Sequence, residues 1–181
     1  MALNRIQPLE SPYNPEVAED LEAMMPPGIE PIKLFRILAH NPRILHKFRM
    51  SNLLDRGSIE RRDREIVILR TCARCKAEYE WGNHVSFFAE RFEISKEQTA
   101  ATVRGNSDDP AWSARDRLLI RLVDELHDTT CIGDGLWTDL KTNWEIPQIL
   151  EFIVLAGFYH TVSFVVNGAR IEQEEGAARF P

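Results

Sequence analysis

The sequence has little of what several protein classes need. It contains 3 cysteines in 181 residues, an odd and small number that offers no disulfide framework. We therefore expect a reducing, cytoplasmic setting. The sequence also contains no glycine-rich phosphate loop and no dinucleotide fingerprint. Its formal net charge of −6 argues against nucleic acid or an anionic membrane surface as a partner.

Long uncharged hydrophobic runs are also missing. No segment shows the basic start, apolar core and small-residue cleavage site of a signal peptide, so none is expected. The most apolar run, residues 149–166, contains Glu151 and His160. Charged and titratable residues are costly in a bilayer, so this run predicts a buried helix rather than a membrane span.

Strict apolar–polar alternation is absent too, so we predict an all-α fold. Prolines are concentrated in residues 1–31, which predicts an extended N-terminal arm with at most a helical turn over 17–24. A helical domain is expected over 32–171, followed by a polar tail over 172–181. Helices are predicted at 32–39, 42–54, from about 60, 114–127, 136–143 and 147–171.

The stretch Tyr-Glu-Trp-Gly-Asn-His at residues 79–84 contains the best candidate for chemistry. Glu80 and His84 stand four residues apart, so on a helix they share one face. A second carboxylate, Glu65, begins an apolar segment upstream. Carboxylate and imidazole together are suited to proton transfer near neutral pH. The alternative interpretation is a solvated pair on a helix surface.

Residues 60–90 resemble the carboxymuconolactone decarboxylase and alkylhydroperoxidase-D superfamily. The resemblance is carried by Arg-Glu-Ile-Val-Ile-Leu-Arg at 64–70, Ala-Glu-Tyr-Glu-Trp at 77–81 and His84, and the segment 159–167 also fits. It implies an AhpD-like helical fold, a homo-oligomer (a trimer or hexamer), and activity without a cofactor on a small-molecule substrate.

The same resemblance implies a break between the two carboxylates. One continuous helix would hold Glu65 and His84 about 28 Å apart, at about 1.5 Å per residue. In the superfamily this region turns back on itself, which here would happen within residues 73–77 and would bring Glu65 close to His84. The sequence has no glycine or proline at that place.

The cysteines depart from the peroxidase branch of the superfamily. Counted from Glu65, its two cysteine positions correspond here to Ala77 and Glu80. Peroxide reduction needs an attacking and a resolving thiol, so it is not expected at this register. Cys72 and Cys75 form a separate Cys-x-x-Cys, which leaves a peroxidase-like oxidoreductase as an alternative to two structural residues on a packed helix. Without a second cysteine pair, no metal site is expected.

We therefore predict a cofactor-independent acid–base enzyme, a decarboxylase, lyase or related proton-transfer enzyme acting on a small organic acid or lactone. His84 would transfer the proton, Glu80 or Glu65 would orient it, and Tyr79 would donate a hydrogen bond to an enolate or carboxylate oxygen. Candidates for the pocket wall are Tyr159, His160 and Trp81, each of which could instead be a core residue. A third hypothesis is a non-catalytic helical oligomer that binds a ligand.

Overall fold

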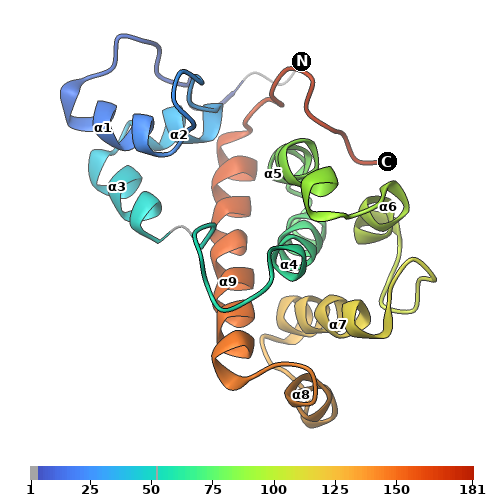
Figure 1. Ribbon diagram of the computed structural model, residues 1–181. Helices are drawn as coiled ribbons and strands as arrows, with labels where there is room; N and C mark the ends of the chain where they lie inside the picture. The colour runs from blue at the N-terminus through green and yellow to red at the C-terminus, as the bar shows by residue number, and fades with distance from the viewer. Residues whose placement is uncertain (1–3, 52) are drawn as a thin grey trace.

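The structure, a computed structural model, describes residues 4–51 and 53–181, and every regular element within those ranges is helical. The predicted all-α class is therefore confirmed. The long helix α9 (Ile146–Ala169) stands in the middle of the molecule (Figure 1). On one side of it lie α1 (Pro15–Ala23), α2 (Lys33–Leu38) and α3 (Pro42–Met50); on the other lie α4 (Arg61–Arg74), α5 (Glu78–His84), α6 (Lys96–Arg104) and α7 (Ala114–Thr129), with α8 (Asp134–Lys141) at its foot.

Several helix ends follow directly from local sequence. The Asn41 side chain accepts a hydrogen bond from the amide of Ile44, with Pro42 in the first turn of α3. Both predicted capping boxes are present, at Ser95 before α6 and at Ser113 before α7. The C-terminal bounds are less accurate: α3 ends at Met50 rather than at 54, and α9 ends at Ala169 rather than at 171.

Helix α4 forms the centre of the core. Every residue from 63 to 72 is buried, because α4 packs against α5, α6, α7 and α9. The polar groups in this stretch are paired, as burial requires. Asp63 contacts Arg115 at 2.8 Å, and Arg70 makes two 2.8 Å hydrogen bonds to Asp124 on α7.

The break between α4 and α5 is where the resemblance places it. Helix α4 ends at Arg74, and α5 begins at Glu78. Lys76 adopts a left-handed conformation, with φ of 56°, and the amide of Ala77 donates to the carbonyl of Cys72 at 2.8 Å. A non-glycine residue is uncommon in this region of φ, which explains why the sequence carries no conventional turn signal.

The two ends of the chain both pack on the helical body. The N-terminal arm contains the nine-residue helix α1, capped by Asn14, where the sequence predicted at most a turn. The C-terminal tail crosses α5, where the Phe180 ring lies 5.2 Å from that of Trp81. Gly82 permits this approach, since a Cβ there would lie 2.2 Å from the carbonyl oxygen of Ala178.

Helix α9 has two different faces. By length and composition alone it could cross a membrane, but in this fold it packs on α4, α5, α7 and α8. The predicted buried helix is therefore confirmed on that side. Its outer row, Leu150, Val154 and Phe164, is 52–70% exposed.

Candidate active site

Three helices bring a carboxylate, an imidazole and a phenol together in the core. The Nδ1 atom of His84 lies 2.7 Å from Oε2 of Glu65, and its Nε2 atom lies 3.0 Å from the hydroxyl of Tyr159. Glu80 is also within reach, with Oε1 3.5 Å from Nε2. The sequence anticipated Glu65, Glu80 and His84 as one group, and Tyr159 as a wall residue is in direct contact with it.

Local geometry explains this convergence. Glu80 and His84 face the same way because they are one turn apart on α5. The turn at Lys76 lays α5 along α4, so that His84 reaches Glu65 near the start of α4. Immediately after His84 the chain forms a π-helix, Val85–Ala89, a rare form that is frequent at functional sites.

The charges in this group are balanced. Burial by itself lowers the pKa of His84, but the charge and hydrogen bond of Glu65, together with Glu80, outweigh it and raise the pKa to about 9. His84 is therefore an imidazolium at neutral pH. Arg64, also buried, lies 3.4 Å from Glu65. Two carboxyl groups thus face two cations inside the core.

Tyr159 supplies a neutral hydroxyl at this site. Burial and the nearby charge of Glu80 raise its pKa well above the usual value, so its proton stays on the oxygen. The imidazolium can donate from Nδ1 to Glu65 and from Nε2 towards Tyr159 or Glu80. The hydroxyl proton of Tyr159 is then available to another acceptor.

Two buried polar groups next to His84 lack partners. Within residues 4–51 and 53–181, no group hydrogen-bonds Oε2 of Glu80 or either amide atom of Asn83. Buried polar atoms in folded proteins are nearly always paired, and exceptions often have a catalytic or binding role. These atoms mark a place where water or a substrate group would be bound.

Comparison with known proteins identifies the fold. No family model matches the sequence, and no curated protein matches it. Solved structures do: the AhpD-core, peroxidase-related protein of Ralstonia eutropha JMP134 is 14% identical, with a TM-score of 0.80 over 97% of this chain and 94% of that one.

A peroxidase-related protein of Silicibacter sp. TM1040 gives 14% identity and a TM-score of 0.78 over 97% of this chain and 96% of its own. The debrominase Bmp8 with bound 2,3,4-tribromopyrrole gives 12% and 0.72 over 94% and 91%. The fold is AhpD-like. At such low identity the likeness concerns the fold, which agrees with the superfamily suggested by residues 60–90.

Within this AhpD-like fold, two predicted site residues point away from His84. The Tyr79 hydroxyl donates to Glu174 at 2.5 Å and accepts from the amide of Leu34 at 3.1 Å. Trp81 donates from Nε1 to Thr102 at 2.9 Å. Both lie on α5 but on faces different from that of His84, so they hold the tail and α6 in place instead of lining the site.

The cysteine pair is poorly placed for redox chemistry. Cys72 is fully buried, and burial raises its pKa well above the usual value. Cys75 caps the C-terminal end of α4, where the helix dipole opposes a thiolate, and burial raises its pKa as well. Both cysteines are free, as expected for two structural residues on a packed helix.

His160 takes part in a second cluster that the sequence did not reveal. Its Nε2 atom lies 3.0 Å from Nδ1 of His127, which in turn lies 4.0 Å from the sulfur of Cys75. The sequence suggested a solvated helix end for His127 and a core or pocket position for His160. Spacings of 52 and 33 residues along the chain leave no local signal for such a contact.

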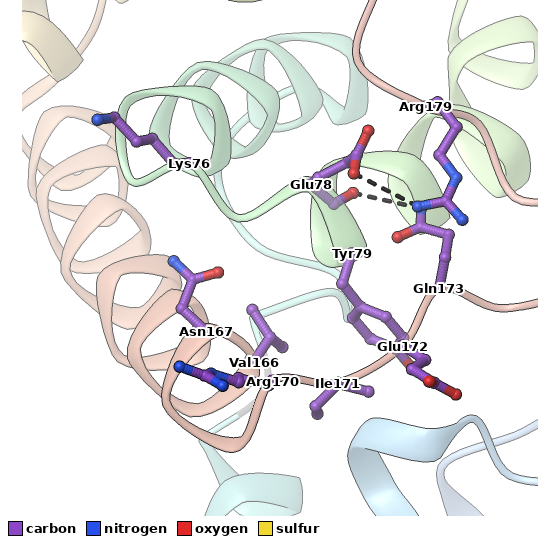
Figure 2. A pocket seen from close by; sticks show the side chains of 10 residues that line it. All are labelled: Lys76, Glu78, Tyr79, Val166, Asn167, Arg170, Ile171, Glu172, Gln173 and Arg179. Carbon is purple, nitrogen blue, oxygen red and sulfur yellow. Dashed lines mark hydrogen bonds and ion pairs between the residues drawn. The ribbon is translucent and has the colours of Figure 1, made fainter. Parts of the chain in front are cut away.

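An open cavity of about 600 Å³ lies apart from His84, between the start of α5, the end of α9 and the tail. Figure 2 shows its lining, which includes Tyr79, Asn167 and the pair formed by Glu78 and Arg179. None of Glu65, Glu80 and His84 lines it. The chemistry is therefore concentrated in the closed site and not in this surface cavity.

Proposed function

We propose that this protein is an enzyme that transfers a proton at His84 to a small organic acid or lactone, with cofactor-free decarboxylation as the first reaction to test. The observation that carries the proposal is the buried chain of hydrogen bonds from Glu65 through His84 to Tyr159. Such a chain fixes the orientation and the proton content of one imidazole, which is what general acid catalysis requires.

The proposed step balances as follows. The bond to the substrate carboxylate breaks, carbon dioxide leaves, and the electron pair moves onto a conjugated carbonyl to form an enolate. The imidazolium of His84 then donates its Nε2 proton to the enolate carbon and later regains a proton from water. Tyr159 donates a hydrogen bond to the enolate oxygen while charge develops there. Glu65 holds Nδ1 and stabilises the cation.

Charge and shape set the substrate class. Because Arg64 and His84 offset Glu65 and Glu80, the site does not repel a substrate with one carboxylate. The Phe88 ring packs 5.2 Å from that of His84, and Phe158 packs 5.7 Å from Tyr159, which gives the site apolar walls. A small, unsaturated acid or lactone matches this combination. The tribromopyrrole bound to Bmp8 is a small ring of comparable shape.

The alternative with Cys72 and Cys75 as redox residues has less support. A buried thiol with a raised pKa supplies little thiolate at neutral pH, and a thiolate is the species that attacks peroxide. The second cysteine is directed towards His127 on α7. We therefore place the chemistry at His84.

The test uses a panel of β-keto acids and unsaturated lactones, with carbon dioxide release and deuterium incorporation at carbon as the two measurements. His84→Gln should lower turnover by about 10²–10⁴-fold, the typical contribution of a general acid. His40→Gln is the matched control, because His40 is exposed and bonded only to the carbonyl of Gln7 among described contacts.

Two results would contradict the proposal. Full turnover in His84→Gln would show that the imidazole is not the acid. Saturable binding of panel compounds without any reaction in the wild type would favour the ligand-binding hypothesis instead. The Cys72→Ser/Cys75→Ser double variant should keep turnover, and loss of a peroxidase activity in it would support the oxidoreductase alternative.

A further inference from the structure

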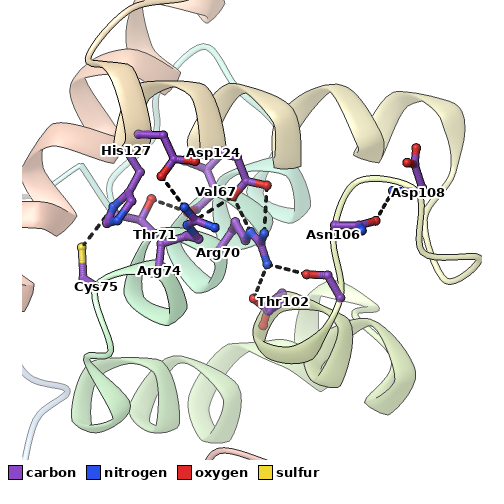
Figure 3. A network of polar contacts seen from close by, with 12 residues as sticks. Val67, Arg70, Thr71, Arg74, Cys75, Thr102, Asn106, Asp108, Asp124 and His127 are labelled. Atoms are coloured by element: carbon purple, nitrogen blue, oxygen red, sulfur yellow. Dashed lines mark hydrogen bonds and ion pairs between the residues drawn. The ribbon is translucent and has the colours of Figure 1, made fainter.

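A second histidine cluster lies at the other end of α4, where three helices meet. Cys75 is at the C-terminal end of α4, His127 is in the last turn of α7, and His160 is on α9. One ligand atom from each, a sulfur and two ring nitrogens, lies within 4.8 Å of the other two. Figure 3 shows Cys75 and His127 turned towards each other beside Arg74.

The distances suit a metal ion. A tetrahedral ion with Zn–N and Zn–S bonds of about 2.0–2.3 Å holds its ligand atoms roughly 3.3–3.8 Å apart. The two printed separations, 3.0 Å between the nitrogens and 4.0 Å between sulfur and nitrogen, lie on either side of that range. Side-chain rotations of a few tenths of an ångström would bring all three atoms onto one ion.

The hydrogen bonds orient one ligand for this purpose. Nδ1 of His160 donates to the carbonyl of Ala156 at 2.9 Å, so the proton is on Nδ1 and the lone pair is on Nε2. That lone pair points at the cluster. Metal-bound histidines almost always donate their other ring N–H to a carbonyl or carboxylate in this way.

The electrostatics permit a cation. Burial and the charge of Arg74 lower the pKa of His127, which favours the neutral imidazole that a metal needs. Arg74 would itself repel a metal ion, but its guanidinium is paired with Asp124 and Asp128. All three ligand residues are partly exposed, so an ion can enter from solvent.

We propose that Cys75, His127 and His160 bind a divalent transition-metal ion of the zinc class, with water in the fourth position. The ligand set combines a thiolate with two imidazoles, which is typical of zinc and of other borderline metals and not of magnesium or calcium. Binding would release the thiol proton of Cys75 and the proton shared between the two histidines. The site joins α4, α7 and α9, so the bound ion stabilises their packing.

The experiment uses the full chain after removal of metals with a chelator. Titration with Zn²⁺ should give one ion per chain and a higher melting temperature. Co²⁺ should give the charge-transfer absorption of a cobalt–thiolate bond, which reports the sulfur directly. Cys75→Ser should abolish that absorption and weaken Zn²⁺ binding by at least about 100-fold, since even the loss of a supporting residue costs 10–100-fold.

Two controls keep the test specific. Cys131→Ser removes the exposed cysteine and should leave both signals unchanged. His160→Gln should weaken Zn²⁺ binding while the thiolate remains, and its melting temperature without metal shows whether it is folded. Absent or non-stoichiometric binding in the wild type, or equal binding in Cys75→Ser, would overturn the proposal. Proton transfer at His84 uses none of these ligands, so the two proposals fail independently.

Discussion

The same two helices, α4 and α9, support two histidine groups of opposite character. At one end, His84 is enclosed between Glu65, Glu80 and Tyr159, and its pKa is raised. At the other end, His127 lies beside Arg74 in a partly exposed cluster, and its pKa is lowered. The fold is shared, so the difference arises from the neighbouring side chains.

This comparison shows how burial and charge act together on an imidazole. Burial disfavours the charged ring in both places, but carboxylates outweigh it at His84 and a guanidinium reinforces it at His127. A ring that keeps its proton can donate it, whereas a ring that loses its proton offers a lone pair. The first group is therefore suited to proton transfer and the second to metal binding.

The largest effect is expected from removal of the carboxylate that holds His84. Glu65→Gln leaves a buried imidazole without its counter-charge, and breaking a buried ion pair typically costs about 3–5 kcal/mol of stability. We expect a value near the lower figure, because the ring can release its proton. Urea unfolding measures this, with Glu175→Gln as an exposed control. A loss no larger than that of the control would mean that Glu65 and His84 do not form a charged pair.

The second prediction concerns pH. The pKa of His84 rises from 6.5 to about 9 on folding, so its contribution to stability is complete below about pH 6.5 and is lost as the pH rises through 9. The free energy of unfolding should fall in this window by up to about 1.4 kcal/mol per pH unit. The decline should be absent from the His84→Gln profile. Identical profiles for the two proteins would show that the imidazole is neutral in the core.

The smallest effect is expected from Tyr159→Phe. The change removes one hydrogen bond to Nε2 of His84 but keeps the aromatic packing against Phe158. We expect a loss of about 1 kcal/mol in unfolding free energy, typical of one buried hydrogen bond. Turnover should fall more than stability if the hydroxyl stabilises the enolate. A drop in stability with unchanged turnover would assign Tyr159 a purely structural role.

Local sequence determined the helical class, the caps at Asn41, Ser95 and Ser113, and the shared face of Glu80 and His84, because each depends on residues within one or two turns. The resemblance added the turn before α5, which neither glycine nor proline announces.

Only the tertiary structure decided which side chains meet. It placed Tyr159 on His84, directed Tyr79 to Glu174, and joined Cys75 to His127 and His160. These contacts depend on how α4, α5, α7 and α9 are rotated against one another. That rotation is set by packing of the whole core, because burying an apolar stripe fixes the direction of every other side chain on the same helix.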